Sequence, residues 1–185
     1  MNNLEQIRII LKLKEIERHA LVKSRRESSA EHSWGCILLA EYFLKKIDYA
    51  LDELKVLKLL AYHDLVEIIS KDHYEIVEDH KRVMPESDAF KILIGKIPEE
   101  LKEEYKSNFY EFEEQKTKES QFAKAIDKIE VLIHMLDYKD EWIKQEWTEQ
   151  KLRDYKEESF KKVPEIYKFF NELIIYLKEN NYFKE

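Results

Sequence analysis

Apolar residues recur every three to four positions along much of the chain, which is the spacing of one face of an α-helix. The first such pattern predicts a helix that ends near Arg18 and is followed by a polar stretch through Arg26. Its apolar positions are Leu4, Ile7, Ile10, Leu11 and Leu13.

A second helix has a well-defined predicted start at Ser28. Ser28 and Glu31 match a capping box, in which a serine hydroxyl and a glutamate three residues later satisfy unpaired amides of the first turn. This places His32 in the first turn. Later patterns predict helices over about 52–69, from Pro98 through Phe112, from near Glu119 through Leu136, and from about Pro164 through Leu177. The segment 73–98 has no clear pattern.

The composition supports an all-α protein. Of 185 residues, 44% are hydrophobic and 12% aromatic, which argues against disorder, and the 38% that are charged belong on helix surfaces. Only two glycines and three prolines occur, so many tight turns or hairpins are not expected. The length fits one domain over residues 1–185. Aromatic-rich final helices could supply the interface of a homodimer.

Several functions are excluded or disfavoured by composition. Two glycines cannot build the phosphate loops of P-loop or dinucleotide-binding proteins. A net charge of −7 gives no broad surface for a nucleic-acid polymer. No signal-peptide core or membrane-length apolar run occurs, and the single Cys36 cannot form an internal disulfide. A soluble cytoplasmic protein without a membrane partner is therefore expected.

Three polar residues lie on faces that are otherwise apolar. His32 shares its face with Cys36 and Phe43, while the adjacent pair His63 and Asp64 follows leucines one turn earlier. A buried carboxylate needs hydrogen bonds, a counter-ion or a metal. Imidazole and carboxylate groups together suit a divalent transition metal ion.

Each of these positions also has a purely structural interpretation. A single inward histidine is more often a hydrogen-bonded core residue than a metal ligand. Asp127 shares a stripe with Ala123, Glu130 and His134 that is compatible with a solvated face, so spacing alone does not select Asp127. Glu31 is explained by the capping box. The remaining histidines, namely His19, His73, His80 and His134, are expected at the surface.

Ordered motifs along most of the chain resemble the HD superfamily of metal-dependent phosphohydrolases, and most closely its 5'-deoxynucleotidases from bacteria and their eukaryotic relatives. They are Arg26 through Ser33, then His63 and Asp64 followed by Glu67 and Asp72, then Ile97 through Leu101, Phe112 through Glu114, and Lys124 through Glu130. The resemblance implies an HD-domain helical bundle with the metal site between core helices. It also implies a small-molecule nucleotide substrate.

The resemblance also assigns roles to individual residues. It implies that His32, His63, Asp64 and Asp127 bind one divalent ion, from among Co, Mn, Mg, Zn, Ni and Fe. It implies a catalytic acid/base role for Glu67, a second acidic role for Asp72, and phosphate or nucleotide contacts for Arg18 and Arg26. In the bacterial enzymes a tryptophan tied to sugar discrimination follows the arginine that matches Arg18, whereas this chain has His19. Deoxyribose preference is therefore not implied.

Three hypotheses follow for function. The first is hydrolysis of ribo- or deoxyribonucleoside 5'-monophosphates to nucleoside and phosphate. The second is a non-catalytic nucleotide-binding or regulatory module with a structural metal, which closed coordination by four protein groups would favour. The third is an oxygen-activating di-iron enzyme, for which His73 and His80 are the imidazoles available nearby.

Overall fold

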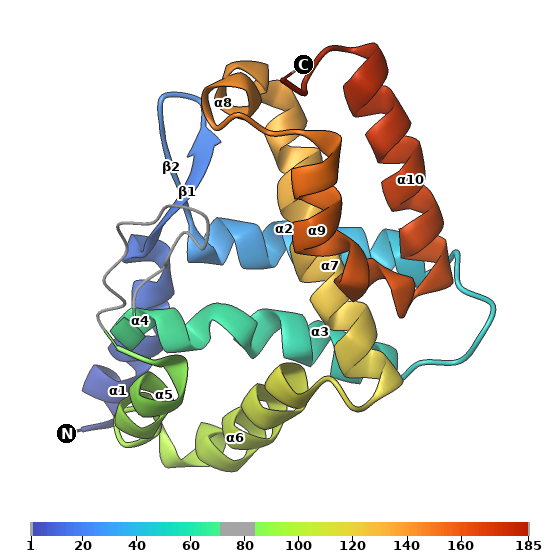
Figure 1. Cartoon of the computed structure of the whole chain (residues 1–185). Coiled ribbons are helices and arrows are strands. Elements are labelled where there is room, and N and C mark those ends of the chain that lie inside the picture. The colour runs from blue at the N-terminus through green and yellow to red at the C-terminus, as the bar shows by residue number, and fades with distance from the viewer. Residues whose placement is uncertain (1, 71–83, 185) are drawn as a thin grey trace.

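The computed structural model describes residues 2–70 and 84–184, and over this part the chain is helical apart from one short hairpin (Figure 1). The prediction of an all-α fold is confirmed. The elements are α1 (Asn3–Ile10), η1 (Leu11–Glu15), β1 (Glu17–Val22), β2 (Arg25–Ser28), α2 (Ser29–Leu44), α3 (Glu53–Tyr62), η2 (His63–Val66), α4 (Glu67–Ser70), α5 (Glu86–Ile94), α6 (Glu99–Glu114), α7 (Lys118–His134), η3 (Met135–Asp137), α8 (Lys139–Lys144), α9 (Glu149–Lys161) and α10 (Pro164–Glu179), where η marks a 3₁₀-helix.

Helices α2, α3 and α7 contact one another and form the centre of the molecule (Figure 1). Their shared core continues to α9 and α10 through buried aliphatic and aromatic side chains, whereas a second apolar cluster joins η2 and α4 to α5 and α6. Fully buried residues of the central cluster include Leu59, Leu60, Ile126, Ile129 and Phe170. These two clusters fix the segments that carry the predicted metal ligands.

Local capping signals set where the helices begin. The Ser28 hydroxyl accepts from the Glu31 amide, and the Ser28 amide donates to the Glu31 carboxylate at 2.9 Å, so the predicted capping box is confirmed. Asp52 caps α3 by accepting from the Lys55 amide at 3.0 Å. Helix α10 begins with Pro164 in its first turn, as predicted.

The prediction of one helix from the N-terminus to Arg18 is wrong beyond Ile10. The α-helix tightens into η1, and the chain then pairs β1 with β2 in a two-stranded antiparallel sheet in which Val22 lies opposite Arg25. The turn contains no glycine, and Lys23 instead adopts the positive φ of 56° that the turn requires. As a result Arg18 lies in a strand and not at a helix end.

The helix predicted over 52–69 is interrupted where the predicted metal ligands His63 and Asp64 lie. Helix α3 ends at Tyr62, η2 covers the next four residues, and α4 begins at Glu67. All four residues of η2 are buried. The tighter 3₁₀ turn rotates His63 and Asp64 relative to the apolar stripe of α3.

Three helices, α5, α8 and α9, lie in segments where the hydrophobic pattern gave no prediction. Helix α9 is strongly charged and buries Leu152 and Phe160 as its main core contacts. Helix α10 leaves Ile175 and Tyr176 exposed, so a homodimer through this surface stays a prediction. Among the described helices, none has both the length and the apolar character required to span a membrane.

Candidate metal centre

The four residues predicted to bind metal come from three elements and lie together inside the protein. His32 is in the first turns of α2, His63 and Asp64 open η2, and Asp127 is in the middle of α7. His32 Nε2 is 3.2 Å from Asp127 Oδ1, and His63 Nε2 is 3.1 Å from Asp64 Oδ1 and 3.9 Å from Asp127 Oδ1. All four side chains are buried.

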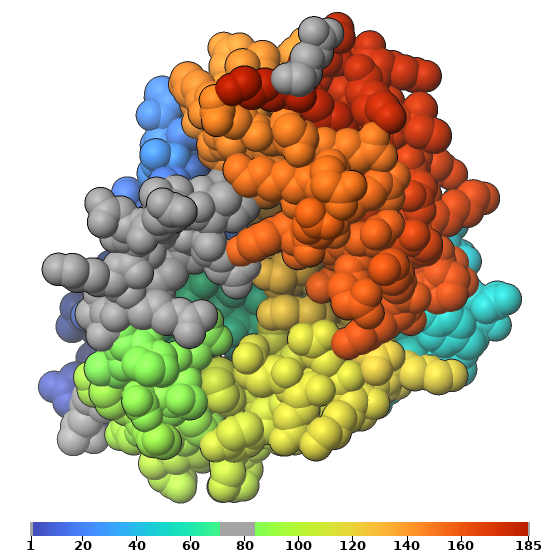
Figure 2. All heavy atoms as spheres, in the orientation of Figure 1, coloured from blue at the N-terminus to red at the C-terminus, as the bar shows by residue number. Residues whose placement is uncertain are grey.

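Two of the three segments that carry these residues, the α3–α4 region and α7, reach a hollow on one face of the molecule. Figure 2 shows this hollow between the green and yellow atoms of α5 and α6 and the orange atoms of α9. Teal atoms from the α3–α4 region and gold atoms of α7 are visible at its floor. A small molecule could therefore approach the elements that hold three of the four predicted ligands.

His63 offers a nitrogen that is prepared for a cation. Its Nδ1 lies 2.7 Å from the Leu60 carbonyl oxygen, a contact that assigns the proton to Nδ1. Burial lowers the pKa of His63, so the ring is neutral and Nε2 carries a lone pair. Nε2 is buried and makes no hydrogen bond with any described residue, although it faces the oxygens of Asp64 and Asp127. Electron-rich atoms that converge in this way fit a bound metal ion.

His32 is held between two carboxylates. Its Nε2 approaches Asp127 Oδ1, and its Nδ1 lies 2.7 Å from Glu130 Oε2. Burial and the nearby Arg18 lower the pKa of His32, but contacts with Cys36 and Asp127 outweigh them and hold this pKa well above its ordinary value. In the absence of a metal the ring is therefore protonated and donates to both carboxylates.

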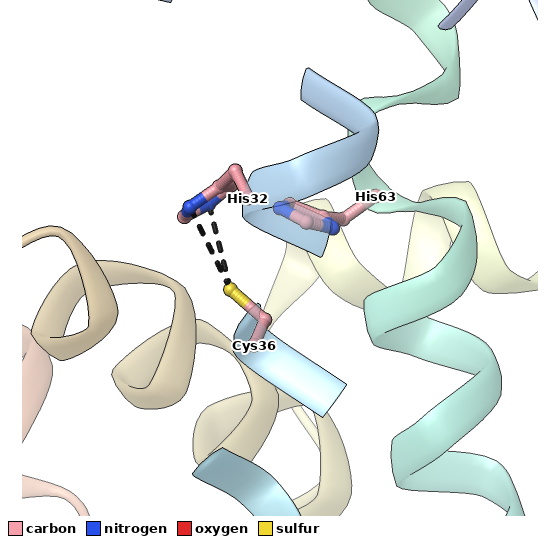
Figure 3. Close-up of side chains that lie close together, drawn as sticks. All are labelled: His32, Cys36 and His63. Carbon is pink, nitrogen blue, oxygen red and sulfur yellow. Dashed lines mark hydrogen bonds between the residues drawn. The ribbon is translucent and has the colours of Figure 1, made fainter. Parts of the chain in front are cut away.

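Cys36 is a further group at this centre that sequence reasoning did not select. Figure 3 shows the Cys36 sulfur directed toward the His32 ring, with the His63 ring beside it, and Sγ is 3.5 Å from His32 Nε2. One ligand atom from each of His32, Cys36 and His63 lies within 4.8 Å of the others. Burial raises the pKa of the Cys36 thiol to about 12, so this thiol is neutral without a metal.

Asp127 lies on a buried face, although the pattern of its stripe was also compatible with a solvated face. Ala123, Asp127 and Glu130 are all buried because α2 packs across this face of α7. Burial would raise the pKa of Asp127, but Lys128 and Lys124, together with His32, hold it well below its ordinary value. Asp127 is therefore an anionic oxygen donor inside the protein.

His134 was expected at the surface, but it is half-buried and lies 2.6 Å from the Leu21 carbonyl oxygen.

Arg18 and Glu67 both reach the acidic side of the centre. Arg18 Nη1 donates to Asp64 Oδ2 at 3.0 Å and lies 3.8 Å from Glu67 Oε1. The Ser29 hydroxyl donates to Glu67 Oε2 at 2.5 Å. Glu67 is thus held in a fixed orientation next to Asp64, and the structure brings two more of the predicted site residues together.

The structure does not bring Arg26 to this group. Strand alternation directs Glu27 inward and leaves Arg26 exposed, where its guanidinium donates to the His19 carbonyl oxygen. His19 is also exposed, as predicted. Asp72, His73 and His80 lie outside the described residues.

Three further charged residues complete the centre, and sequence reasoning missed them. Glu27 is buried, and its Oε2 is 3.6 Å from Arg18 Nε. Lys124 Nζ is 3.5 Å from Asp127 Oδ2 and 4.3 Å from the centroid of the Phe112 ring. The only local signal for Glu130 and Lys124 was their position three residues after and before Asp127.

Comparison with known proteins places these residues in a family. The family model described as "HD domain" matches residues 10–167. The chain is 28% identical over 147 residues to the Bos taurus protein named 5'-deoxynucleotidase HDDC2, and this alignment covers 75% of this chain and 69% of the relative. It is 27% identical over 145 residues to the Homo sapiens protein of the same name, and that alignment covers 74% of this chain and 68% of the relative.

Solved structures agree with this family match. A Magnetospirillum magnetotacticum protein described as a predicted metal-dependent phosphohydrolase is 27% identical, with a TM-score of 0.86 over 98% of this chain and 94% of that chain. An HD-domain phosphohydrolase from Listeria innocua, 16% identical, covers 97% of this chain and 87% of its own with a TM-score of 0.59, and it supports the fold alone. The resemblance inferred from the motifs is confirmed: this chain belongs to the HD-domain family.

Proposed function

We propose that this protein is a metal-dependent phosphohydrolase that releases phosphate from ribo- or deoxyribonucleoside 5'-monophosphates. The observation that carries the proposal is the convergence of His32, His63, Asp64 and Asp127, with the buried lone pair of His63 Nε2 facing carboxylate oxygens. Relatives named 5'-deoxynucleotidase and a structural neighbour described as a metal-dependent phosphohydrolase support the reaction class.

The donor atoms present fit a divalent cation. Two imidazole nitrogens and two carboxylates form a mixed N/O donor set, which suits Co, Mn, Fe, Ni or Zn, whereas Mg prefers oxygen ligands such as the two carboxylates. When bound, such an ion supplies Lewis-acid stabilisation of phosphate charge and lowers the pKa of a coordinated water. His63 is preorganised for this role, because the Leu60 carbonyl fixes its tautomer.

Glu67 is the proposed acid/base group. The Ser29 hydroxyl donates to this carboxylate, and Arg18 lies 3.8 Å from it, so the carboxylate is oriented beside Asp64. A carboxylate in this position can accept a proton from the attacking water and return it to the leaving nucleoside oxygen. Asp72 is proposed to assist it, on the basis of the resemblance alone.

Positive side chains around the centre are suited to phosphate recognition. Arg18 already contacts Asp64, and its planar guanidinium can form paired hydrogen bonds with phosphate oxygens. Lys124 adds a second cation: burial lowers its pKa, but Asp127 and Glu113 outweigh burial and raise it, so the ammonium stays charged. We propose that both groups contact the substrate phosphate.

A phosphate-release screen of ribo- and deoxyribonucleoside monophosphates, run with Co²⁺, Mn²⁺, Mg²⁺, Zn²⁺, Ni²⁺ and Fe²⁺ and paired with metal analysis of the purified protein, tests the proposal. The expected result is release from 5'-monophosphates that depends on metal and is lost in Glu67→Gln. Lys144→Gln is the matched control, because Lys144 lies on the surface of α8 and its variant should turn over like the wild type. Stoichiometric metal without phosphate release from any nucleotide would contradict the proposal and favour a regulatory module.

A further inference from the structure

Gly35 occupies an unusual position in the middle of α2, three residues after His32. Glycine is disfavoured inside helices relative to alanine, and it is usually retained where the backbone needs a positive φ. Neither glycine of this chain has a positive φ. The reason for Gly35 must therefore lie in what surrounds it and not in its backbone conformation.

The side chain of Glu130 fills the space beside Gly35. A Cβ atom at position 35 would lie 2.4 Å from Glu130 Oε1, which is closer than real Cβ contacts, and 3.1 Å from Glu130 Cδ, so the carboxylate end of Glu130 would have to shift. Glu130 comes from α7, which packs against α2, and it is buried. The missing Cβ therefore leaves the room that lets this carboxylate enter between the two helices.

In this position Glu130 reaches His32. Glu130 Oε2 is 2.7 Å from His32 Nδ1, while His32 Nε2 is directed to Asp127. Histidines that bind metals commonly donate their second ring N–H to a carboxylate, which fixes the ring and its tautomer and strengthens the ligand. The arrangement at His32 has this geometry.

We propose that Glu130 is a positioning residue that orients His32 for metal binding, and that Gly35 is required because it makes space for Glu130. The inference rests on the proposed function, in which His32 Nε2 binds the ion. Two residues that no motif assigned thus act as one unit, although they lie 95 positions apart in the chain. Their effect is transmitted only through His32 Nδ1.

An alternative use of Glu130 would be to hold a second ion together with Glu27. One ligand atom from each of Glu27, His32 and Glu130 lies within 4.8 Å of the others. However, Glu27 already has polar neighbours, since it lies 3.6 Å from Nε of the Arg18 guanidinium and 3.5 Å from His134 Nδ1. A second ion would also have to take the His32 nitrogen that carries the proton shared with Glu130. The positioning role therefore accounts better for these contacts.

The test measures the affinity of the purified protein for Co²⁺ by competition with a chromophoric chelator. Glu130→Ala should weaken Co²⁺ binding by about 10- to 100-fold, the range typical for loss of such a partner. Glu130→Gln keeps a hydrogen-bond acceptor and should weaken binding less. Gly35→Ala should weaken binding because its Cβ displaces the carboxylate, even though alanine favours the helix.

Two further variants separate this mechanism from a general structural effect. Gly95→Ala is the matched control, because its Cβ would meet only the Ile92 carbonyl oxygen at 3.5 Å, an ordinary contact, and it should bind Co²⁺ like the wild type. The double variant Gly35→Ala/Glu130→Ala should bind no more weakly than Glu130→Ala, because the group that Cβ displaces is already gone. Additive losses in the double variant would overturn the proposed link.

Unchanged Co²⁺ affinity in a folded Glu130→Ala protein would overturn the positioning role. Two equivalents of Co²⁺ in the wild type, with one lost in Glu130→Ala, would overturn it in favour of an ion between Glu27 and Glu130. A wild type that binds no Co²⁺ would refute the proposed function instead. In that case ¹⁵N-edited NMR of the metal-free protein still tests the contact: the His32 Nδ1–H should exchange slowly in the wild type and rapidly in Glu130→Ala.

Discussion

Replacing Arg18 with methionine should destabilise the metal-free protein and make its stability depend more strongly on metal. Arg18 donates to Asp64 at 3.0 Å and lies 3.8 Å from Glu67 and 3.6 Å from Glu27, and only 14% of its side chain is exposed. Methionine retains much of the apolar stem but removes the charge. Three buried carboxylates then lose a shared cation.

The size of the effect follows from this geometry. Unit charges 3.0 Å apart attract by about 5.5 kcal/mol at an effective dielectric constant near 20, before the cost of desolvating the guanidinium is subtracted. Removing one partner of a buried pair costs about 3–5 kcal/mol. Because part of Arg18 still reaches water, we expect about 3 kcal/mol, or a fall in Tm of about 6–12 °C for a domain of this size.

Thermal unfolding with and without Co²⁺ checks this reasoning. The ion contributes positive charge to the same carboxylates, so the variant should bind it more tightly and saturating Co²⁺ should narrow the difference in Tm. Arg25→Met is the control, since Arg25 lies on the same hairpin but pairs with Glu31 in an exposed position, and its Tm should change little. An Arg18→Met protein as stable as the wild type without metal, or a difference unaffected by Co²⁺, would refute the reasoning.

Three other variants test the acid/base group, a metal ligand and the cap of the helix that carries His32. Glu67→Gln should lower turnover by about 10²- to 10⁴-fold while metal analysis finds the ion retained, and near-normal turnover would exclude Glu67 as the acid/base. Asp127→Ala should lose the metal itself, so a stoichiometric ion in that variant would remove Asp127 from the ligand set. In the capping box, Arg25 and Ser28 lower the pKa of Glu31 to about 2 from 4.5. Glu31 therefore contributes stability above pH 4.5 that is lost as the pH falls through about 2. At neutral pH, the free energy of unfolding of Glu31→Gln, measured with denaturant, should be about 0.5–1 kcal/mol lower than that of the wild type. The two values should converge as the pH falls from 4.5 to about 2.

The sequence predicted those features that depend on neighbours in the chain. The capping box at Ser28 needs only residues three positions apart, and it forms as predicted; the predicted helix start near residue 52 is likewise set by the local cap at Asp52. The inward direction of His32 followed from apolar residues one turn away on the same helix, and that of His63 followed from the apolar residues of α3 just before it. These interactions are local, so one sequence contains the information needed to infer them.

Features that depend on distant segments were not predictable in the same way. The hairpin was missed because its turn uses Lys23 at a positive φ without glycine, and because strand pairing joins residues on opposite sides of that turn. The stripe of Asp127 looked polar because its burial depends on α2, which lies some ninety residues earlier. The family motif, and not periodicity, identified Asp127.

The charges at the centre indicate that this part of the fold is shaped for binding and not for stability. Among the described residues, five carboxylates are buried at the centre, and each contacts one of the two histidines or Arg18; they are Glu27, Asp64, Glu67, Asp127 and Glu130. Taking several anions out of water costs free energy that ion pairs recover only in part. The apolar contacts of α2, α3 and α7 can offset that cost, since they form the continuous core directly beneath the site. A site that is electron-rich before any ligand arrives favours a divalent cation, as the proposed function requires. The proposed phosphate contacts then fall to Arg18, which lies beside Asp64, and to Lys124, which lies beside Asp127.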